Sequence, residues 1–159
     1  MKKINKITIK YLPDYDADLS YLGTFDNEQK SEYAINHEPD NSRVFNWFNP
    51  QETTGDTPRN LRKYAKQNYE RIMQYERGNW SMYGIKAEAK IATDAGYESW
   101  LLNEITSGGL WGLESDMDDA SFKQVEDEQL DELKDVLRQI GFTDKEINAT
   151  PIENERKAA

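Results

Sequence analysis

Two acidic triplets have the residue types and spacing that open a calcium-binding loop. Asp14-x-Asp16-x-Asp18 and Glu114-x-Asp116-x-Asp118 place a carboxylate at every second position, and oxygen ligands at that spacing suit Ca²⁺. Neither triplet continues as such a loop, because glycine is missing at the sixth position and glutamate at the twelfth. We therefore expect no calcium site, and the sequence predicts no other metal or cofactor site.

The sequence contains no strong catalytic motif. His37 is the only histidine and there is no cysteine, so metal clusters of histidines or thiolates are excluded and a Ser-His-Asp triad would depend on His37 alone. Ser107-Gly108-Gly109 could form an anion-binding nest, but two glycines after a strand are more often a turn or a bulge. We expect a protein that is not an enzyme, although carboxylate pairs for glycoside hydrolysis stay open because acids are plentiful.

Negative charge is concentrated in one segment. The formal charge is -10, and residues 114–135 hold -8 of it, with ten acids against two lysines. Acids three and four residues apart on a helix repel one another and destabilise it, so their presence here indicates a function for the acidic surface. Two interpretations compete: a solubilising exterior, or a docking surface for a basic partner with an apolar anchor beside it. The candidate partner-binding residues are Trp111, Glu114, Asp116, Asp118, Asp119, Glu128, Asp131, Glu132 and Asp135.

A docking surface of this kind could imitate nucleic acid. At about 1.5 Å rise per residue, the segment presents roughly one carboxylate per 3 Å, against about one charge per 1.7 Å in duplex DNA. Mimicry would therefore be partial. The expected partner is a basic protein surface and not nucleic acid itself, since the chain lacks a dense basic patch.

Two other charged features leave alternatives open. Glu126 falls on the apolar side of the expected helix, so it requires a salt bridge from a lysine or arginine of the sheet or first helix, or else it is a functional carboxylate. The helix expected over 58–77 has a basic outer face, which is either a solvated surface or a site for an anion or acidic partner. Its basic residues are Arg59, Arg62, Lys63, Lys66, Arg71 and Arg77.

The elements that must position these residues indicate an α+β fold. Alternating apolar residues predict a strand over 4–12 and a β-hairpin over about 82–106. Apolar residues at three- and four-residue steps predict two amphipathic helices, about 58–77 and 118–140, packed on a small antiparallel sheet. Residues 26–57 indicate only short strands and long loops.

Length and composition indicate one soluble, cytoplasmic domain. A chain of 159 residues can bury one core, and we expect a single domain over 1–149 followed by a disordered tail over 150–159. No stretch approaches the ~20 apolar residues of a membrane helix, and residues 1–6 do not lead into the apolar run of a signal peptide. The absence of cysteine suits a reducing compartment.

Three stretches stand out as motifs: residues 11–23, Tyr-Glu-Arg-Gly-Asn-Trp (75–80), and above all Thr-Ser-Gly-Gly-Leu-Trp-Gly-Leu-Glu-Ser-Asp (106–116) before the acidic helix. With them the chain resembles a group of small acidic proteins of bacterial phages and mobile elements that have no established activity. It implies an origin and not a chemistry, and no functional residue follows from it. Because small acidic phage proteins often inhibit host defence by binding a host protein, the resemblance favours the docking surface.

Two alternative functions stay open. One is a small-ligand-binding protein, or an enzyme of an unrecognised type, with a cleft between the first helix and the hairpin that uses arginine or tyrosine side chains. The other is a structural or assembly component of a phage particle, which predicts self-association and requires no cleft.

Overall fold

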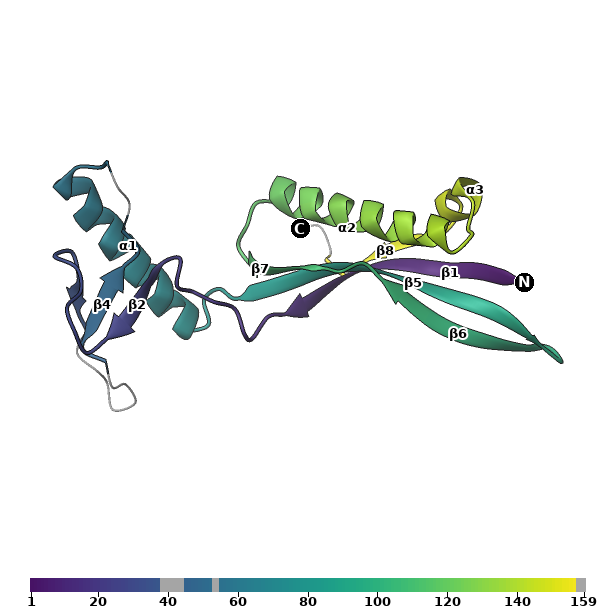
Figure 1. The fold of residues 1–159 in the computed structure, drawn as a ribbon, viewed down its shortest axis with the longest axis horizontal. Helices are drawn as coiled ribbons and strands as arrows, with labels where there is room; N and C mark the ends of the chain where they lie inside the picture. Colours follow the sequence, from purple (N-terminus) through teal and green to yellow (C-terminus); the bar gives the residue numbers. More distant parts are fainter. Residues whose placement is uncertain (38–44, 53–54, 157–159) are drawn as a thin grey trace. The chain divides into compact units, whose positions relative to one another are not determined.

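The computed structural model describes residues 1–37, 45–52 and 55–156, which form two compact units (Figure 1). Unit 1 comprises Met1–Tyr15 and Ser81–Ala159, and unit 2 comprises Asp16–Trp80. Unit 2 is thus inserted in the sequence between two parts of unit 1. This division was not predicted from the sequence, which indicated one domain over 1–149.

Unit 1 is built on a five-stranded mixed sheet. Its strands are β1 (Lys2–Pro13), β5 (Met82–Gly96), β6 (Ser99–Thr106), β7 (Leu110–Glu114) and β8 (Ile152–Asn154). The long strands β1 and β5 pair antiparallel along the whole of β1. β6 and β7 pair with opposite ends of β5, and β8 adds to β1 in parallel. The hairpin predicted over about 82–106 is confirmed as β5 and β6.

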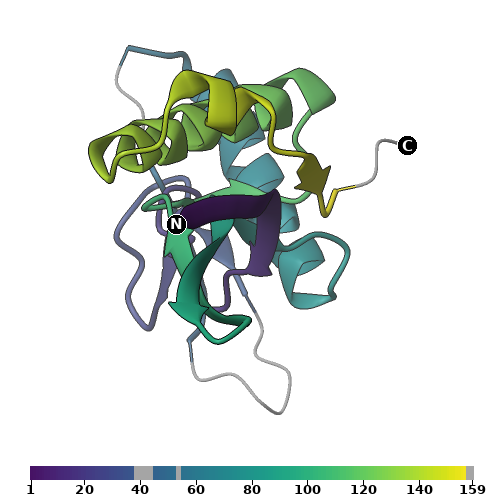
Figure 2. The same ribbon diagram turned by 90° about the vertical axis from the view of Figure 1, so that its right-hand side faces the viewer.

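The face of this sheet that carries Ile7 and Ile85 is covered by α2 (Asp119–Gln139), which Figures 1 and 2 show lying along it. Alternation in the strands sends apolar side chains to this face, and the leucine stripe of α2 meets them. Ile7, Ile85, Leu133 and Leu137 have no exposed surface. The second predicted helix, about 118–140, is confirmed.

The C-terminal segment continues the fold of unit 1. α3 (Asp144–Asn148) begins with a capping box of Thr143 and Glu146. The sequence predicted a disordered tail over 150–159, of which Ile152–Asn154 form β8 and residues 157–159 lie outside the described residues. The amide of Ile7 donates to the carbonyl of Pro151 at 3.0 Å and that of Glu155 to the carbonyl of Ile9 at 3.0 Å. A three-residue strand held by a distant edge leaves no local pattern in the sequence.

The opposite face of the sheet is polar. Its rows place Lys10 beside Lys86, and Thr8 beside Glu88. Oε1 of the buried Glu88 lies 3.2 Å from Nζ of Lys10, so the two residues form an ion pair. Among the described residues, no donor meets the geometry of a hydrogen bond to this oxygen. Interaction with Glu88 raises the pKa of Lys10. Lys10 therefore stays charged on this face.

Unit 2 packs α1 (Pro58–Glu76) on a three-stranded antiparallel sheet. The strands, in sheet order, are β2 (Gly23–Asp26), β4 (Trp47–Pro50) and β3 (Ile35–Asn36). Phe48 is fully buried, and its ring centroid lies 5.2 Å from that of Phe25 and 5.5 Å from that of Tyr69. The predicted helix over about 58–77 is confirmed, capped by Thr57. Each predicted helix therefore covers a sheet of its own.

Candidate functional site

The outer side of α2 carries the exposed acids that the sequence indicated. Asp127, Glu128, Asp131 and Asp135 project away from the leucine stripe, and we call these four residues the acidic face. Lys123 pairs with Asp127 at 2.5 Å and Arg138 with Asp135 at 2.7 Å. Within the described part of the chain, no lysine or arginine pairs with Glu128 or Asp131.

Several predicted partner-binding acids bind groups within the chain instead. Asp118 caps α2, where its Oδ1 accepts from the amide of Ser121 at 2.7 Å, and this lowers the pKa of Asp118. Asp119 pairs with Arg156 at 2.7 Å. Glu114 is half-buried at the end of β7, and Asp116 is exposed before α2. These four acids lie before α2 or at its first residue, outside the acidic face.

Glu132 accepts a hydrogen bond from the Ser-Gly-Gly turn, for which the sequence left an anion nest or a plain turn open. The amide of Gly108 donates to Glu132 Oε1 at 2.7 Å, and that of Gly109 donates to Gln129 Oε1 at 2.9 Å. The Ser107 hydroxyl also donates to Gln129 at 2.7 Å. The Ser-Gly-Gly turn therefore holds side chains of α2, and Glu132 fixes the turn in place of an outside anion.

Trp111 does not lie beside the acidic face. Its ring covers Gly84, which points to the side of the sheet opposite α2, because the side chain of the next residue, Ile85, points toward α2. The Trp111 side chain is 48% exposed. The predicted combination of Trp111 with the acids of α2 in one surface is therefore wrong, since strand alternation separates them.

Gly84→Ala should displace the Trp111 ring. A Cβ atom on Gly84 would lie 2.1 Å from Cε3 of Trp111, so ring or backbone must move, and we expect a loss of stability of about 1–3 kcal/mol. Thermal unfolding measures the loss. In Gly84→Ala/Trp111→Ala the clash is absent, so the two changes should be strongly non-additive. Additive losses would contradict this packing.

Glu126 is a buried acid of unit 1, with 4% of its side chain exposed. Its carboxylate accepts from the hydroxyl of Tyr11 on β1, and its Oε1 lies 3.4 Å from Nε of Arg156. The predicted salt bridge exists, but its cation comes from the segment after β8 and not from the sheet or first helix. Burial and the hydrogen bond to Glu126 raise the pKa of Tyr11, so its hydroxyl stays protonated and donates.

A groove of about 520 Å³ lies beside this buried acid, and we call it the Tyr11 groove. Its lining residues are Tyr11, Pro13, Tyr83, Ser115, Met117, Asp119, Phe122, Glu155 and Arg156. The ring centroids of Tyr83 and Phe122 lie 6.3 Å and 6.0 Å from that of Tyr11, both edge-on. The groove thus combines aromatic walls with two carboxylates and one guanidinium, a lining suited to a cation.

His37 belongs to the core of unit 2. It is 6% exposed, its Nδ1 lies 2.6 Å from the Tyr69 hydroxyl, and its ring packs edge-on against Phe25 at 5.1 Å. A buried polar ring of this kind is normally satisfied by such a hydrogen bond. The structure therefore gives His37 a packing role.

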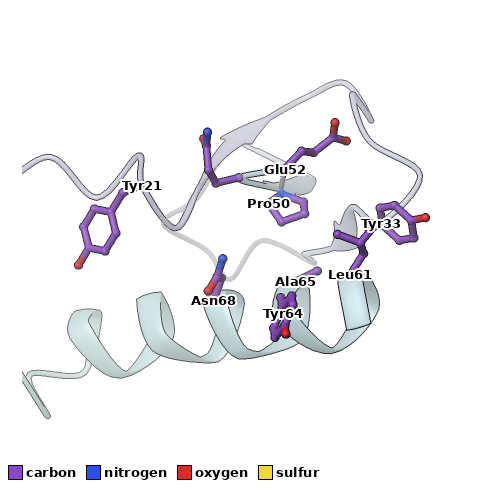
Figure 3. A pocket seen from close by; sticks show the side chains of 9 residues that line it. Tyr21, Tyr33, Pro50, Glu52, Leu61, Tyr64, Ala65 and Asn68 are labelled. Carbon is purple, nitrogen blue, oxygen red and sulfur yellow. The ribbon is translucent and has the colours of Figure 1, made fainter. Parts of the chain in front are cut away.

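A smaller groove of about 230 Å³ lies in unit 2 between α1 and the end of β4 (Figure 3). Leu61, Tyr64, Ala65 and Asn68 come from α1, while Tyr21 and Tyr33 stand at its two ends. A neighbouring groove of about 500 Å³ includes Arg62 and Lys66 of the predicted basic face. These grooves are where the small-ligand alternative would apply. Each of the grooves described lies inside one unit.

Two general features complete the description. Among the described residues, no group of three or more histidine, aspartate or glutamate side chains is arranged to hold a metal ion. No helix in residues 1–37, 45–52 and 55–156 is long and apolar enough to span a membrane.

Comparisons with known proteins gave no match: neither a protein-family model, nor a curated protein, nor a solved structure matches the chain. The α+β fold with its hairpin is therefore established from the structure alone. Functional inference depends on the surfaces and grooves described above.

Proposed function

We propose that the protein acts without catalysis, by docking the acidic face of α2 on a basic surface of another protein. The observation that carries this proposal is that Glu128 and Asp131 stay exposed and without a cationic partner among the described residues. The buried side of the same helix is filled by Leu133 and Leu137, so the helix is fixed while Glu128 and Asp131 stay exposed to a partner. Charge complementarity would speed the encounter and select the partner.

The proposal extends to the kind of partner. A host protein with a basic, nucleic-acid-binding surface in the cytoplasm is the target that the resemblance to phage proteins supports, and inhibition of host defence is the corresponding role. Lys123 and Arg138 interrupt the row of acids on α2, so mimicry of nucleic acid would be partial. The protein itself would not bind nucleic acid, because an acidic surface repels phosphate. Trp111 is left out of the docking surface because it lies on the opposite side of the sheet.

A charge-reversal experiment tests the acidic face. Glu128→Lys/Asp131→Lys changes two exposed acids and leaves the core untouched, so the fold should survive. The matched control is Glu28→Lys/Glu70→Lys, which changes the net charge equally on exposed positions of unit 2. Each protein is immobilised and challenged with host lysate, and the same retained host protein is then quantified.

We expect the α2 double variant to retain that protein at least about tenfold less than wild type, while the control retains it normally. Retention by wild type should also fall steeply between about 50 and 200 mM salt, because exposed charges are screened. If both double variants lose the partner equally, net charge and not the acidic face would explain binding. If neither loses it, the acidic face is only a solvated exterior.

A further inference from the structure

We propose that the Tyr11 groove is a binding site for an arginine side chain carried on an extended segment of the partner, and that Arg156 occupies this site from within the chain. The inference rests on the proposed function, because it names the residue of the basic partner that the protein would recognise. It also assigns a site that the sequence did not indicate.

The first support is the set of groups that already hold a guanidinium. Nη1 of Arg156 lies 2.7 Å from Oδ1 of Asp119, and its Nε lies 3.2 Å from the Tyr11 hydroxyl and 3.4 Å from Oε1 of Glu126. Its central carbon lies 4.8 Å from the centroid of the Phe122 ring. Two carboxylates at the edge and an aromatic ring on one side match the planar fork of arginine, and lysine offers no such fork.

The second support is the charge balance of the site. Asp119, Glu126 and Glu155 lie around a single cation, Arg156. Because Glu126 is almost fully buried, leaving it without a cation would place an uncompensated charge in the interior. The site therefore favours an arginine whether it comes from this chain or from another.

The third support is that the segment delivering Arg156 follows a short strand at the edge of the sheet. β8 has three residues at the edge of the sheet, and Ile152 is 49% exposed. Its ion pair, Lys6 with Glu153, is exposed on both sides, so it contributes little. An extended partner segment could pair with β1 as β8 does and place its own arginine in the groove, which is the strand-addition mode of peptide recognition.

A peptide experiment tests the site directly. The probe is the seven-residue peptide Thr-Pro-Ile-Glu-Asn-Glu-Arg, identical to residues 150–156, and its control carries citrulline in place of arginine. In wild type the tethered Arg156 competes at a high effective concentration. In full-length Arg156→Ala that competitor is absent, while Asp119, Glu126, Phe122 and Tyr11 remain.

We expect Arg156→Ala to bind the arginine peptide at least about tenfold more tightly than wild type, and the citrulline peptide at least about tenfold more weakly than the arginine peptide. NMR titration of the full-length proteins gives the Kd values. Equal Kd values for the two peptides, or no gain over wild type, would overturn the proposal.

A second variant covers the case in which Arg156→Ala does not fold. Glu153→Lys does more than remove the weak ion pair with Lys6, because it places a cation near both Lys6 and Lys90, and repulsion from the two loosens β8. Every group that contacts the guanidinium stays in place. It should bind the arginine peptide more tightly than wild type and discriminate against citrulline in the same way. If a folded Glu153→Lys shows neither effect, the groove holds Arg156 only as part of the fold.

The same proteins separate the two proposals. Glu128→Lys/Asp131→Lys keeps all groove contacts, so it should bind the arginine peptide as wild type does. Loss of host-protein retention in this variant, together with no peptide binding by Arg156→Ala, would support the acidic face and reject the groove. The reverse pattern would support the groove and reject the acidic face.

Discussion

Phe48→Ala is expected to lower the free energy of unfolding of unit 2 by about 3–5 kcal/mol. Phe48 is fully buried at the centre of the small sheet, with aromatic neighbours on β2 and α1. Removing the ring leaves a cavity between α1 and β4 that side chains of a short sheet cannot fill. Urea unfolding followed by tryptophan fluorescence measures the loss, because the buried Trp80 reports on this unit.

Phe45→Ala is the matched control for Phe48→Ala. It deletes the same ring at a position that is 44% exposed, so the loss should stay below about 1 kcal/mol. Similar losses for the two variants would show that Phe48 does not form the core of unit 2.

Arg156→Ala is expected to lower the free energy of unfolding of unit 1 by about 3 kcal/mol at pH 7, because it leaves the carboxylate of Glu126 buried without a cation. Breaking a buried ion pair is costly because the remaining charge has no partner in the interior. Urea unfolding of wild type and Arg156→Ala at pH 7 measures the loss.

Arg138→Ala is the control for this prediction. Arg138 is also ion-paired, with Asp135 and Asp144, but all three side chains are well exposed, so its loss should be below about 1 kcal/mol. A loss for Arg156→Ala no larger than that for Arg138→Ala would contradict the assignment of Glu126 as its buried partner.

The parts of the fold that depend on local patterns were predictable. The two helices follow from apolar residues at three- and four-residue steps, and the hairpin from alternation over 82–106. Thr57 and Gly141 mark helix ends through their own chemistry. These signals lie within about 20 residues of one another, so sequence alone records them.

The parts that depend on distant pairing were not predictable. β8 has three residues, and only the edge of β1, more than 140 residues earlier, makes it a strand. The cation for Glu126 was expected from the sheet or first helix, but Arg156 arrives with β8. No periodicity in residues 150–156 indicates either contact.

The candidate docking residues were predictable in type but not in role. Ten acids in one segment indicated an acidic surface, and α2 does present one. Whether a given acid is exposed for a partner depends on contacts at a distance, as with Glu132 on Gly108 and Asp119 on Arg156. Trp111 was assigned to the wrong side because only pairing with β5 shows which way it points.

The pairing of β1 with β5 also dictates an order of events during synthesis. β1 ends at Pro13, but β5 begins only at Met82. β1 therefore cannot pair with β5 until all of unit 2 has been synthesised. The amide of Asp14 donates to the carbonyl of Met82 at 2.9 Å, so the two ends of unit 2 meet at one point of the finished sheet. A unit 2 that has already folded replaces a long flexible loop between β1 and β5, and this lowers the entropy cost of pairing the two strands. The inserted unit then serves as the folded connection between the antiparallel strands β1 and β5.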